Sequence, residues 1–431
     1  GFPTDNVNQR FTYDATDRLS FQLRGGYFRN ITRRPAAAYD YDLQHRTYSW
    51  GAGVKYLLSP DAYITADYQA DFFSSRYNFL NASKTYKTQP GDELVRKRTR
   101  NQQANVKGIF NLGERNKVSV GVEYLADMLS SPTENISHKT AYTAAIFAQD
   151  EITITRQLRA LAGVRYLYHE YFKSYATPNV ALMYGQGGLN VRASYAAGFR
   201  APTLSELYAS ETTKSVDRIT IGNLNLKPEK SDYFSLNAEY AHSRFTVSTN
   251  FFYNRIRDMI DYRTIATGEE AKKQYGHEEV RQRDNVYKAE VRGINVAAQA
   301  YLGAGFRIGA GYTHLDTKDD ETGRPIDKSL RNAANVNAQW SRTWGGYTMN
   351  VYLNGRINSE RFSKTYGYAP AYQVWDLNTR HTFSLRSVIL EPGVGIENLF
   401  NYTDDRPYNF NYATLTPGRS VYVSLSIKFK G

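Results

Sequence analysis

Apolar and polar residues alternate along many segments of about ten residues, and this period of two most constrains the fold. In residues 421–429, apolar side chains occupy every odd position from Val421 to Phe429. The same alternation runs through residues 189–195, 245–253 and 347–356. Because successive side chains of a β-strand point to opposite faces, each segment predicts a strand with one apolar and one polar face.

The length of the strand-like segments indicates where they fold. Residues 92–113, 243–262 and 284–302 form long spans, whereas strands of soluble sandwiches average about five or six residues. A strand tilted by about 45° crosses a bilayer in about 9–11 residues, and no apolar run approaches the ~20 residues of a membrane-spanning helix. We therefore predict an all-β fold, a transmembrane antiparallel β-barrel that occupies residues 1–431 as one domain.

Composition agrees with a barrel. The mean hydropathy of −0.59 is low for a membrane protein, but only alternate residues of a barrel strand face lipid. Tyr occurs 36 times and Phe 21 times, and tyrosine suits the two membrane interfaces. Cysteine is absent, as suits a chain that crosses an oxidising periplasm. The net charge of +12 is scattered, which favours anionic lipid headgroups over nucleic acid as a partner.

Two kinds of connection separate the segments. Tight turns are predicted at 59–61, 113–116, 185–188, 303–305 and 344–346, where Gly, Pro, Asn or Asp occur. Long polar loops are predicted near 29–45, 78–92, 131–139, 198–230, 264–283, 317–330, 359–370 and 401–417. Short turns on one side and long loops on the other are typical of outer-membrane barrels, whose long loops are extracellular.

Counting strands backward from the C-terminus gives about 19, whereas plugged outer-membrane transporters have about 22. The odd number predicts that about three strands, and whatever precedes them, are missing from the N-terminal side. The chain begins Gly1-Phe2-Pro3 without an initiator Met or a signal peptide, as a processed or truncated product would.

Three blocks of sequence resemble TonB-dependent outer-membrane receptors. They are Arg192–Tyr208 with Phe199-Arg-Ala-Pro202, followed by Gly222–Lys230; Ile396–Asn401 with Pro417-Gly-Arg419 and the closing strand 421–429; and Phe147–Ile152 leading into Leu161–Tyr166. The first block looks like the two boxes that flank a long extracellular loop in this family, although Leu224 stands where the second box has proline. Together the matches extend from about residue 141 to the end of the chain.

The resemblance implies a barrel of the 22-strand type and an N-terminal plug domain that is absent from these residues. The plug would carry the TonB box and couple the barrel to TonB, ExbB and ExbD. The family's function implies active uptake of a scarce nutrient across the outer membrane, with an iron complex, a siderophore or haem, favoured here. Cobalamin uptake is the nearest alternative, and a passive porin is an alternative from another class. Lipopolysaccharide and a surface lipoprotein are further expected partners.

Aromatic and basic residues of the loops are the candidate ligand contacts, because they can stack on a flat or catecholate ligand and attract its negative charge. They are Arg200, Tyr208, Arg361, Tyr366, Tyr368, Tyr408, Phe410 and Tyr412. The tyrosines could instead belong to the interfacial girdle, and Arg200 could form a local charge pair with Glu206. Arg192, Glu239 and Arg356 are predicted to face the lumen, where they could contact the plug or line an open pore.

No enzyme site is predicted. The seven histidines have no zinc-site spacing. Asp316, Asp319, Asp320, Glu321 and Asp327 form an acidic loop that could hold calcium, but a solvated loop is the alternative because the spacing of a known calcium loop is missing. Neither a catalytic residue nor a resident cofactor is therefore expected.

Overall fold

The computed structural model describes residues 3–34, 36, 40–84, 86–213, 216–319, 323–326, 329–363, 367–403 and 418–429. The chain forms two compact units. Unit 1 comprises Gly1–Val180, Ala196–Ser231 and Arg257–Tyr287, and unit 2 comprises Ala181–Tyr195, Asp232–Ile256 and Lys288–Gly431.

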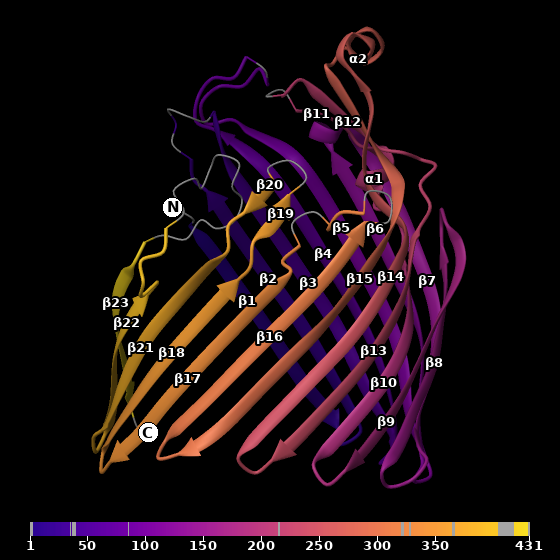
Figure 1. Ribbon diagram of the computed structural model, residues 1–431. Helices are drawn as coiled ribbons and strands as arrows, with labels where there is room; N and C mark the ends of the chain where they lie inside the picture. Colours follow the sequence, from indigo (N-terminus) through magenta and orange to yellow (C-terminus); the bar gives the residue numbers. More distant parts are fainter. Residues whose placement is uncertain are drawn as a thin grey trace. The chain divides into compact units, whose positions relative to one another are not determined.

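Unit 1 is built on an antiparallel meander in which each strand pairs with the next (Figure 1). Its strands are β1 (Thr4–Thr16), β2 (Leu19–Thr32), β3 (Tyr41–Ser59), β4 (Ala62–Phe79), β5 (Glu93–Leu112), β6 (Asn116–Ser131), β7 (Ile136–Thr153) and β8 (Leu158–His169). The shorter elements of unit 1 are the 3-10 helix η1 (Pro132–Glu134), α1 (Leu204–Tyr208), β11 (Ser210–Thr213), β12 (Arg218–Ile221) and α2 (Gly268–Tyr275).

Unit 2 contains a second antiparallel meander, which begins with the last part of β15. Its strands are β16 (Phe306–Asp319), β17 (Asn332–Trp344), β18 (Tyr347–Asn358), β21 (Tyr372–Ser384), β22 (Val388–Glu397) and β23 (Ser420–Phe429), with β19 (Arg361–Ser363) and β20 (Gly367–Ala369) as a small separate hairpin. Five strands have residues in both units: β9 (Lys173–Gln186), β10 (Leu189–Arg200), β13 (Glu229–His242), β14 (Phe245–Thr267) and β15 (Glu279–Gly303).

The predicted strands and tight turns are confirmed, whereas most of the predicted loop at 401–417 lies outside the described residues. Nineteen strands formed by the described residues have ten or more residues, in line with the predicted number of about 19. All five predicted tight turns join consecutive strands. Gly305 shows why glycine is needed there: its φ is +87°, and a Cβ would collide with the carbonyl oxygen of Ser341. No helix in the described part of the chain is long and apolar enough to cross a membrane.

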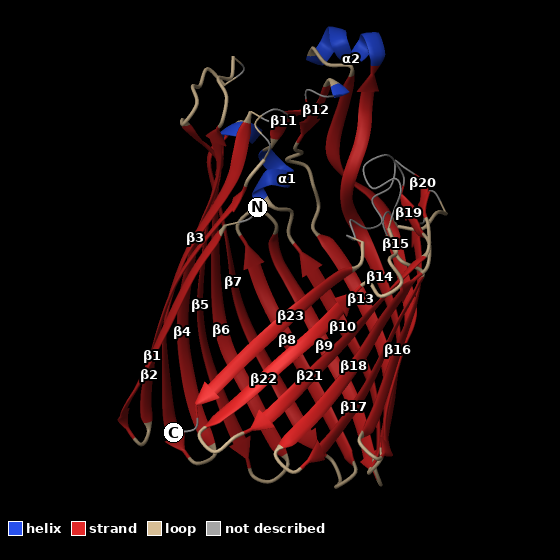
Figure 2. Ribbon diagram, turned by 90° about the vertical axis from the view of Figure 1, so that its left-hand side faces the viewer, coloured by secondary structure: helices blue, strands red, loops and turns tan. Residues whose placement is uncertain are grey.

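In each unit, short turns join the strands at one end and longer connections join them at the other. We call these the turn end and the loop end. Helices α1 and α2 belong to the loop end of unit 1 (Figure 2). The predicted loops at 198–230 and 264–283 thus contain ordered helices and short strands.

Pairing register gives the sheet of unit 1 an apolar face and a polar face. One row along the apolar face joins neighbouring strands from β2 to β8, and it consists of Leu23, Ala52, Tyr68, Ala104, Tyr124, Ala144 and Tyr168. Asp67, Asn105 and Glu123 form part of a row on the polar face, where Glu123 pairs with Arg165 at 3.0 Å. Alternation in the sequence therefore becomes two chemically distinct surfaces.

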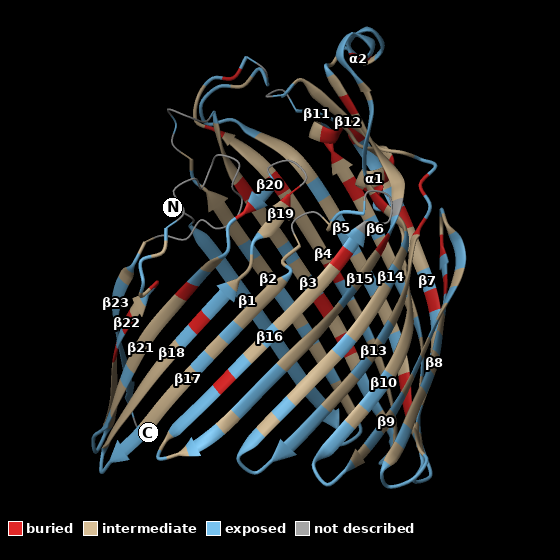
Figure 3. Cartoon of the chain, viewed as in Figure 1, coloured by how far each residue is buried: buried red, intermediate tan, exposed pale blue. Residues whose placement is uncertain are grey.

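Buried apolar side chains of unit 1 gather around α1 (Figure 3). Leu204 packs with Leu129, Ile136 and Ala141 of the β6–β7 hairpin. Leu207, three residues further along the helix, packs with Leu226 and Ile260. The helix thus ties one hairpin to the segment before β13 and to β14.

Candidate functional site

Helix α1 begins directly after Phe199-Arg-Ala-Pro202. Thr203 is its N-cap residue, and its hydroxyl accepts the N–H of Glu206 while the Glu206 carboxylate accepts the N–H of Thr203. This reciprocal capping box satisfies two backbone donors that a helix N-terminus leaves unpaired. The first sequence box therefore encodes a sharp change from strand to helix.

Arg200 lies between two acidic residues at the same place. Its Nε and Nη2 donate to the two carboxylate oxygens of Glu229 at 2.7 and 2.6 Å, and Nη1 donates to Glu206 at 3.1 Å. The Glu229 carboxylate also accepts the backbone N–H of Ile260 at 2.8 Å. Both carboxylates are mostly buried, while Arg200 is 42% exposed. The predicted alternative, a local charge pair with Glu206, is thus present, and Glu229 is a further partner that the sequence analysis did not name.

The second sequence box is fixed to its surroundings by two close contacts. Gly222 donates its N–H to the carbonyl of Ala209 at 2.7 Å, and a Cβ at Gly222 would lie 2.6 Å from the carbonyl group of Leu207. The side-chain amide of Asn285 accepts the N–H of Lys227 at 2.7 Å and donates to its carbonyl at 2.9 Å. The two boxes therefore form one packed structure around α1.

Tyr208, a predicted ligand contact, is part of this packing. Its ring lies 6.5 Å from the ring of Tyr171, and the Nζ of Lys139 lies 4.3 Å from its centroid. Tyr208 also contacts both buried clusters around α1. The side chain is only partly exposed, so the structure gives Tyr208 a packing role.

The connection after α1 runs beside the start of β15. Arg218–Ile221 of β12 pairs in parallel with Glu279–Gln282, and Glu279 accepts from Arg218 at 2.7 Å and from Arg281 at 2.6 Å. Just before this pairing, the Nδ1 of His277 lies 2.9 Å from the Asp217 carboxylate, which also accepts the N–H of Glu278. The hydrogen bond to His277 is the main reason that the pKa of Asp217 is below its usual value.

An aromatic group on the polar face of unit 1 was missed in the sequence analysis. The ring centroids of Tyr41 in β3 and Tyr77 in β4 lie 3.9 Å apart. The ring centroid of Tyr86 lies 5.8 Å from that of Tyr77. The guanidinium carbon of Arg34 lies 5.5 Å from the Tyr41 ring. Closer to the turn end on the same face, the ring of His45 stacks on the ring of Phe73, and their centroids are 5.6 Å apart. We call these residues, together with Phe79, the aromatic wall.

Sequence signals for the aromatic wall did exist. Tyr41 and His45 occupy odd positions of β3, and Phe73, Tyr77 and Phe79 occupy odd positions of β4. Aromatic residues therefore replace polar ones on the polar face at its loop end, where Thr65, Asp67, Gln69 and Asp71 precede them on the same strand. These residues can be recognised as one group only when the pairing register of β3 and β4 is known, and in that register Leu43 is opposite Tyr77.

Two of the three predicted lumen residues come together in unit 2. Arg192 and Glu239 line a hollow of about 440 Å³ with Met183, Asn190, Asn237, Asn250 and Asn295 among its other residues. The side-chain oxygen of Asn250 is buried without a hydrogen-bond partner among the described residues. Arg356 does not line this hollow and is exposed on β18, opposite Asn335.

The remaining predicted contacts lie elsewhere in unit 2. Arg361 pairs with Ala369 in the β19–β20 hairpin, where the exposed ring of Tyr368 lies 5.3 Å from Phe362. Tyr366, Tyr408, Phe410 and Tyr412 lie outside the described residues. Of the acidic loop that could hold calcium, Asp316 is paired with Arg292 at 2.7 Å, and Asp320, Glu321 and Asp327 lie outside the described residues.

Long strands with one apolar face, short turns and an elaborate loop end define a class of protein, the large outer-membrane barrels. The sequence profile of the family described as "TonB dependent receptor-like, beta-barrel" matches residues 1–399, and the chain belongs to this family. Its barrels are outer-membrane proteins, so the chain is an outer-membrane barrel. The predicted family and location are therefore confirmed, and the family is one of receptors and not of enzymes.

Solved structures show the same fold. A mutant of the ferric enterobactin receptor PfeA from Pseudomonas aeruginosa has a TM-score of 0.81 at 17% identity, covering 100% of this chain and 70% of that one. The siderophore receptor PirA from Acinetobacter baumannii has a TM-score of 0.79 at 15% identity, covering 100% and 71%. The copper transporter OprC has a TM-score of 0.73 at 14% identity, covering 98% and 71%. The predicted transmembrane β-barrel is thus confirmed as the fold.

Similarity to a curated protein is more local. The probable hemoglobin and hemoglobin-haptoglobin-binding protein 4 of Haemophilus influenzae is 31% identical over 120 residues, which cover 27% of this chain. The chain spans 12% of the length of that relative in this match.

Proposed function

We propose that the protein is the barrel part of a TonB-coupled transporter that takes up an iron complex with aromatic, negatively charged groups. The observation that carries this proposal is the aromatic wall. Its rings and the Arg34 guanidinium stand at the loop end of the polar face, where a ligand arriving from outside the cell would first meet the barrel. Aromatic faces and a cation suit the flat rings and negative charge of a ferric catecholate siderophore.

Haem is the second candidate ligand, and His45 is the observation that favours it. Its imidazole belongs to the aromatic wall and is stacked on Phe73. A neutral imidazole nitrogen can ligate iron, and an aromatic neighbour can pack against a porphyrin. Similarity to a haemoglobin-binding protein and to siderophore receptors is compatible with either ligand.

The packed structure around α1 has a supporting role in this proposal. Arg200, Glu206 and Glu229 satisfy one another, so they hold the loop end in place and leave little of their hydrogen-bonding capacity for a ligand. In unit 2, the hollow with Arg192, Glu239 and the unpartnered Asn250 oxygen offers hydrogen-bonding groups to a plug domain. TonB, ExbB and ExbD would act through that plug, and a surface lipoprotein would be an additional partner.

Uptake by cells tests the proposed function. The full-length gene is expressed in a TonB-positive strain and in its TonB-deleted twin, and uptake of labelled ferric enterobactin, haem and cobalamin is compared. We expect one iron complex to enter only when TonB is present. Equal uptake in both strains would support a passive pore instead, and TonB-dependent uptake of cobalamin alone would replace the iron complex as the substrate.

Binding by the purified full-length protein tests the aromatic wall itself. Tyr77→Ala should weaken binding of the transported iron complex by roughly fivefold, because one stacking ring contributes about 1 kcal/mol. Tyr63→Ala is the matched control, since Tyr63 lies on the same face of the same strand at the turn end. Equal affinity of the Tyr77 variant and the control would rule out the aromatic wall as the binding site.

A further inference from the structure

Five arginines lie on the apolar face of unit 1 at its loop end. In the register of the sheet, Arg29 of β2 is opposite Arg46 of β3, and Arg46 is opposite Ser74, which is opposite Arg98 of β5. Arg100 and Arg76 occupy positions of the same face on β5 and β4. This face is apolar toward the turn end, where Leu23, Val106 and Val122 lie. A group of cations on it needs an explanation.

Acidic residues neutralise only part of this group. Arg29 pairs with Asp5 at 2.6 Å, and Glu93 pairs with Arg46 at 3.3 Å and with Arg76 at 2.8 Å. Arg98 and Arg100 form no ion pair with any residue that the structure describes. The guanidinium carbon of Arg100 lies 5.1 Å from the Phe72 ring, an arrangement that leaves the N–H groups at its edge available. Two adjacent outward positions on β5 therefore carry uncompensated positive charge.

Aromatic residues fix the depth of these arginines in the membrane. Tyr27 and Tyr48 lie directly below Arg29 and Arg46, with ring centroids 5.1 Å apart. Trp50 and Tyr68 lie further toward the turn end than these tyrosines, and their ring centroids are 5.0 Å apart. Aromatic girdles of barrels mark the level of the lipid headgroups. Arg98 and Arg100 are thus at headgroup level, where phosphate groups of lipids are found.

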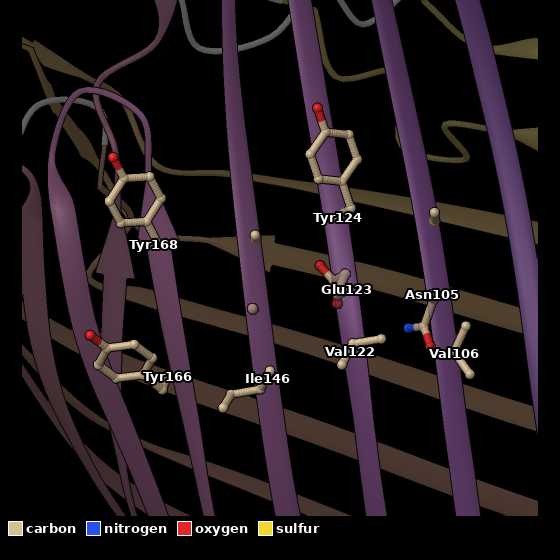
Figure 4. A pocket seen from close by; sticks show the side chains of 11 residues that line it. Asn105, Val106, Val122, Glu123, Tyr124, Ile146, Tyr166 and Tyr168 are labelled. Carbon is tan, nitrogen blue, oxygen red and sulfur yellow. The ribbon is translucent and has the colours of Figure 1, made fainter.

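An apolar hollow lies further toward the turn end of the same face (Figure 4). Its volume is about 520 Å³, and its lining includes Ala104, Val106, Val122, Tyr124, Ala144, Ile146, Tyr166 and Tyr168. Small Ala104 and Ala144 alternate along one row with the large rings of Tyr124 and Tyr168, which leaves depressions between the rings. Ala104 is four residues from Arg100 on β5, a separation of roughly 13 Å.

We propose that this face binds a phosphate-bearing lipid of the outer leaflet. Its phosphate accepts hydrogen bonds from Arg98 and Arg100, and one acyl chain lies in the hollow over Ala104 and Ala144. Charge complementarity selects a phosphorylated headgroup, and the continuous path from arginines to hollow selects a lipid over a free anion. In unit 2, by contrast, Arg292 at the loop end of the apolar face is already paired with Asp316.

Lipid binding by the purified full-length protein tests this proposal. The detergent-solubilised protein is titrated with mixed micelles that contain diphosphorylated lipid A, dephosphorylated lipid A or phosphatidylcholine, and separately with inorganic phosphate. We expect diphosphorylated lipid A to bind most tightly. The double variant Arg98→Gln, Arg100→Gln should bind it about 30-fold more weakly, because each cation near a lipid surface contributes about fivefold. Arg292→Gln is the matched control and should bind like the unaltered protein.

A second variant tests the hollow without altering any charge. Ala144 is exposed on the apolar face, so Ala144→Phe fills the hollow without displacing packed atoms and should weaken lipid A binding severalfold. TonB-dependent uptake of the iron complex should persist in all of these variants, which shows that the barrel is assembled. Unchanged lipid A binding in the double arginine variant would overturn the proposal. So would equal binding of phosphatidylcholine, binding of inorganic phosphate as tight as that of lipid A, or lipid A binding that is insensitive to Ala144→Phe.

Discussion

The loop ends of the two units are organised differently. In unit 1, buried Leu129, Leu204, Leu207 and Ile260 form clusters around a capped helix. In unit 2, the buried apolar residues among those described are Ala289, Ala369 and Val374, and the β19–β20 hairpin consists of three residue pairs. Since local stability follows the burial of apolar contacts, the loop end of unit 1 is a small folded core, whereas the described residues at the loop end of unit 2 form no such apolar cluster.

This difference has a functional meaning. A preorganised surface loses little conformational entropy when it binds a ligand, so the rigid loop end of unit 1 suits a fixed recognition surface such as the aromatic wall. A hairpin of low local stability can change conformation when a ligand arrives. In the proposed transporter, unit 1 would therefore provide the first contact with the ligand.

Removing a core side chain from α1 should have the largest effect on this comparison. Leu207→Ala deletes a buried side chain next to Leu226 and Ile260 and should destabilise the loop end of unit 1 by about 3 kcal/mol. Hydrogen exchange of the amides in residues 203–209 measures the loss. Leu425→Ala is the control in unit 2, because Leu425 is 64% exposed on the apolar face and leaves no cavity. Comparable loss of protection around α1 in both variants would remove the distinction between the loop ends.

Breaking the ionic contacts of Arg200 should have the next largest effect. Arg200→Ala leaves the buried carboxylates of Glu229 and Glu206 without their cation and should destabilise the same segment by about 2 kcal/mol. Arg200→Lys should recover part of this, since lysine cannot bind both oxygens of Glu229 in the same plane. Exposed Arg356 of unit 2 supplies the control Arg356→Ala. Protease resistance of residues 198–230 that is unchanged in Arg200→Ala would contradict a structural role for this arginine.

Sequence reasoning could predict the strands because a membrane requires long segments with strict alternation. It located the tight turns, such as 303–305, through glycines that adopt positive φ. It also identified Arg200 and Glu206 as partners, because they are close in sequence. Glu229 is 29 residues from Arg200, and nothing in a single sequence specifies that contact.

Register explains the other differences between prediction and structure. The aromatic wall and the outward arginines each combine residues of several strands, and a shift of one residue would move every side chain to the opposite face. Tyr208 was predicted as a ligand contact from its type and its place in a loop. Its packing depends on Tyr171 of the β8–β9 connection and on Lys139 of β7, which could not be aligned with α1 in advance.

The smallest expected effect is a difference between two histidine contacts in their response to acid. His277 of unit 1 lies against the carboxylate of Asp217 at 2.9 Å, whereas His314 of unit 2 lies against the amide oxygen of Asn332 at 2.8 Å. The pKa of Asp217 is held below its usual value of 3.8, mainly by the hydrogen bond to His277. Because the folded-state pKa of Asp217 is lowered, this contact stabilises the loop at pH values above the usual pKa of an aspartate. That stabilisation is lost as the pH falls through the folded-state pKa.

NMR of protein labelled at histidine can follow both contacts during an acid titration. The imidazole resonances of His277 should shift as the pH falls below about 4, when Asp217 becomes protonated, and Asp217→Asn should abolish this step. His314 should show no step in the same range, because an amide does not ionise there. A step of equal size at His314 would mean that acid disturbs the two loop ends in common, and the local contact with Asp217 would no longer explain the pH dependence in unit 1.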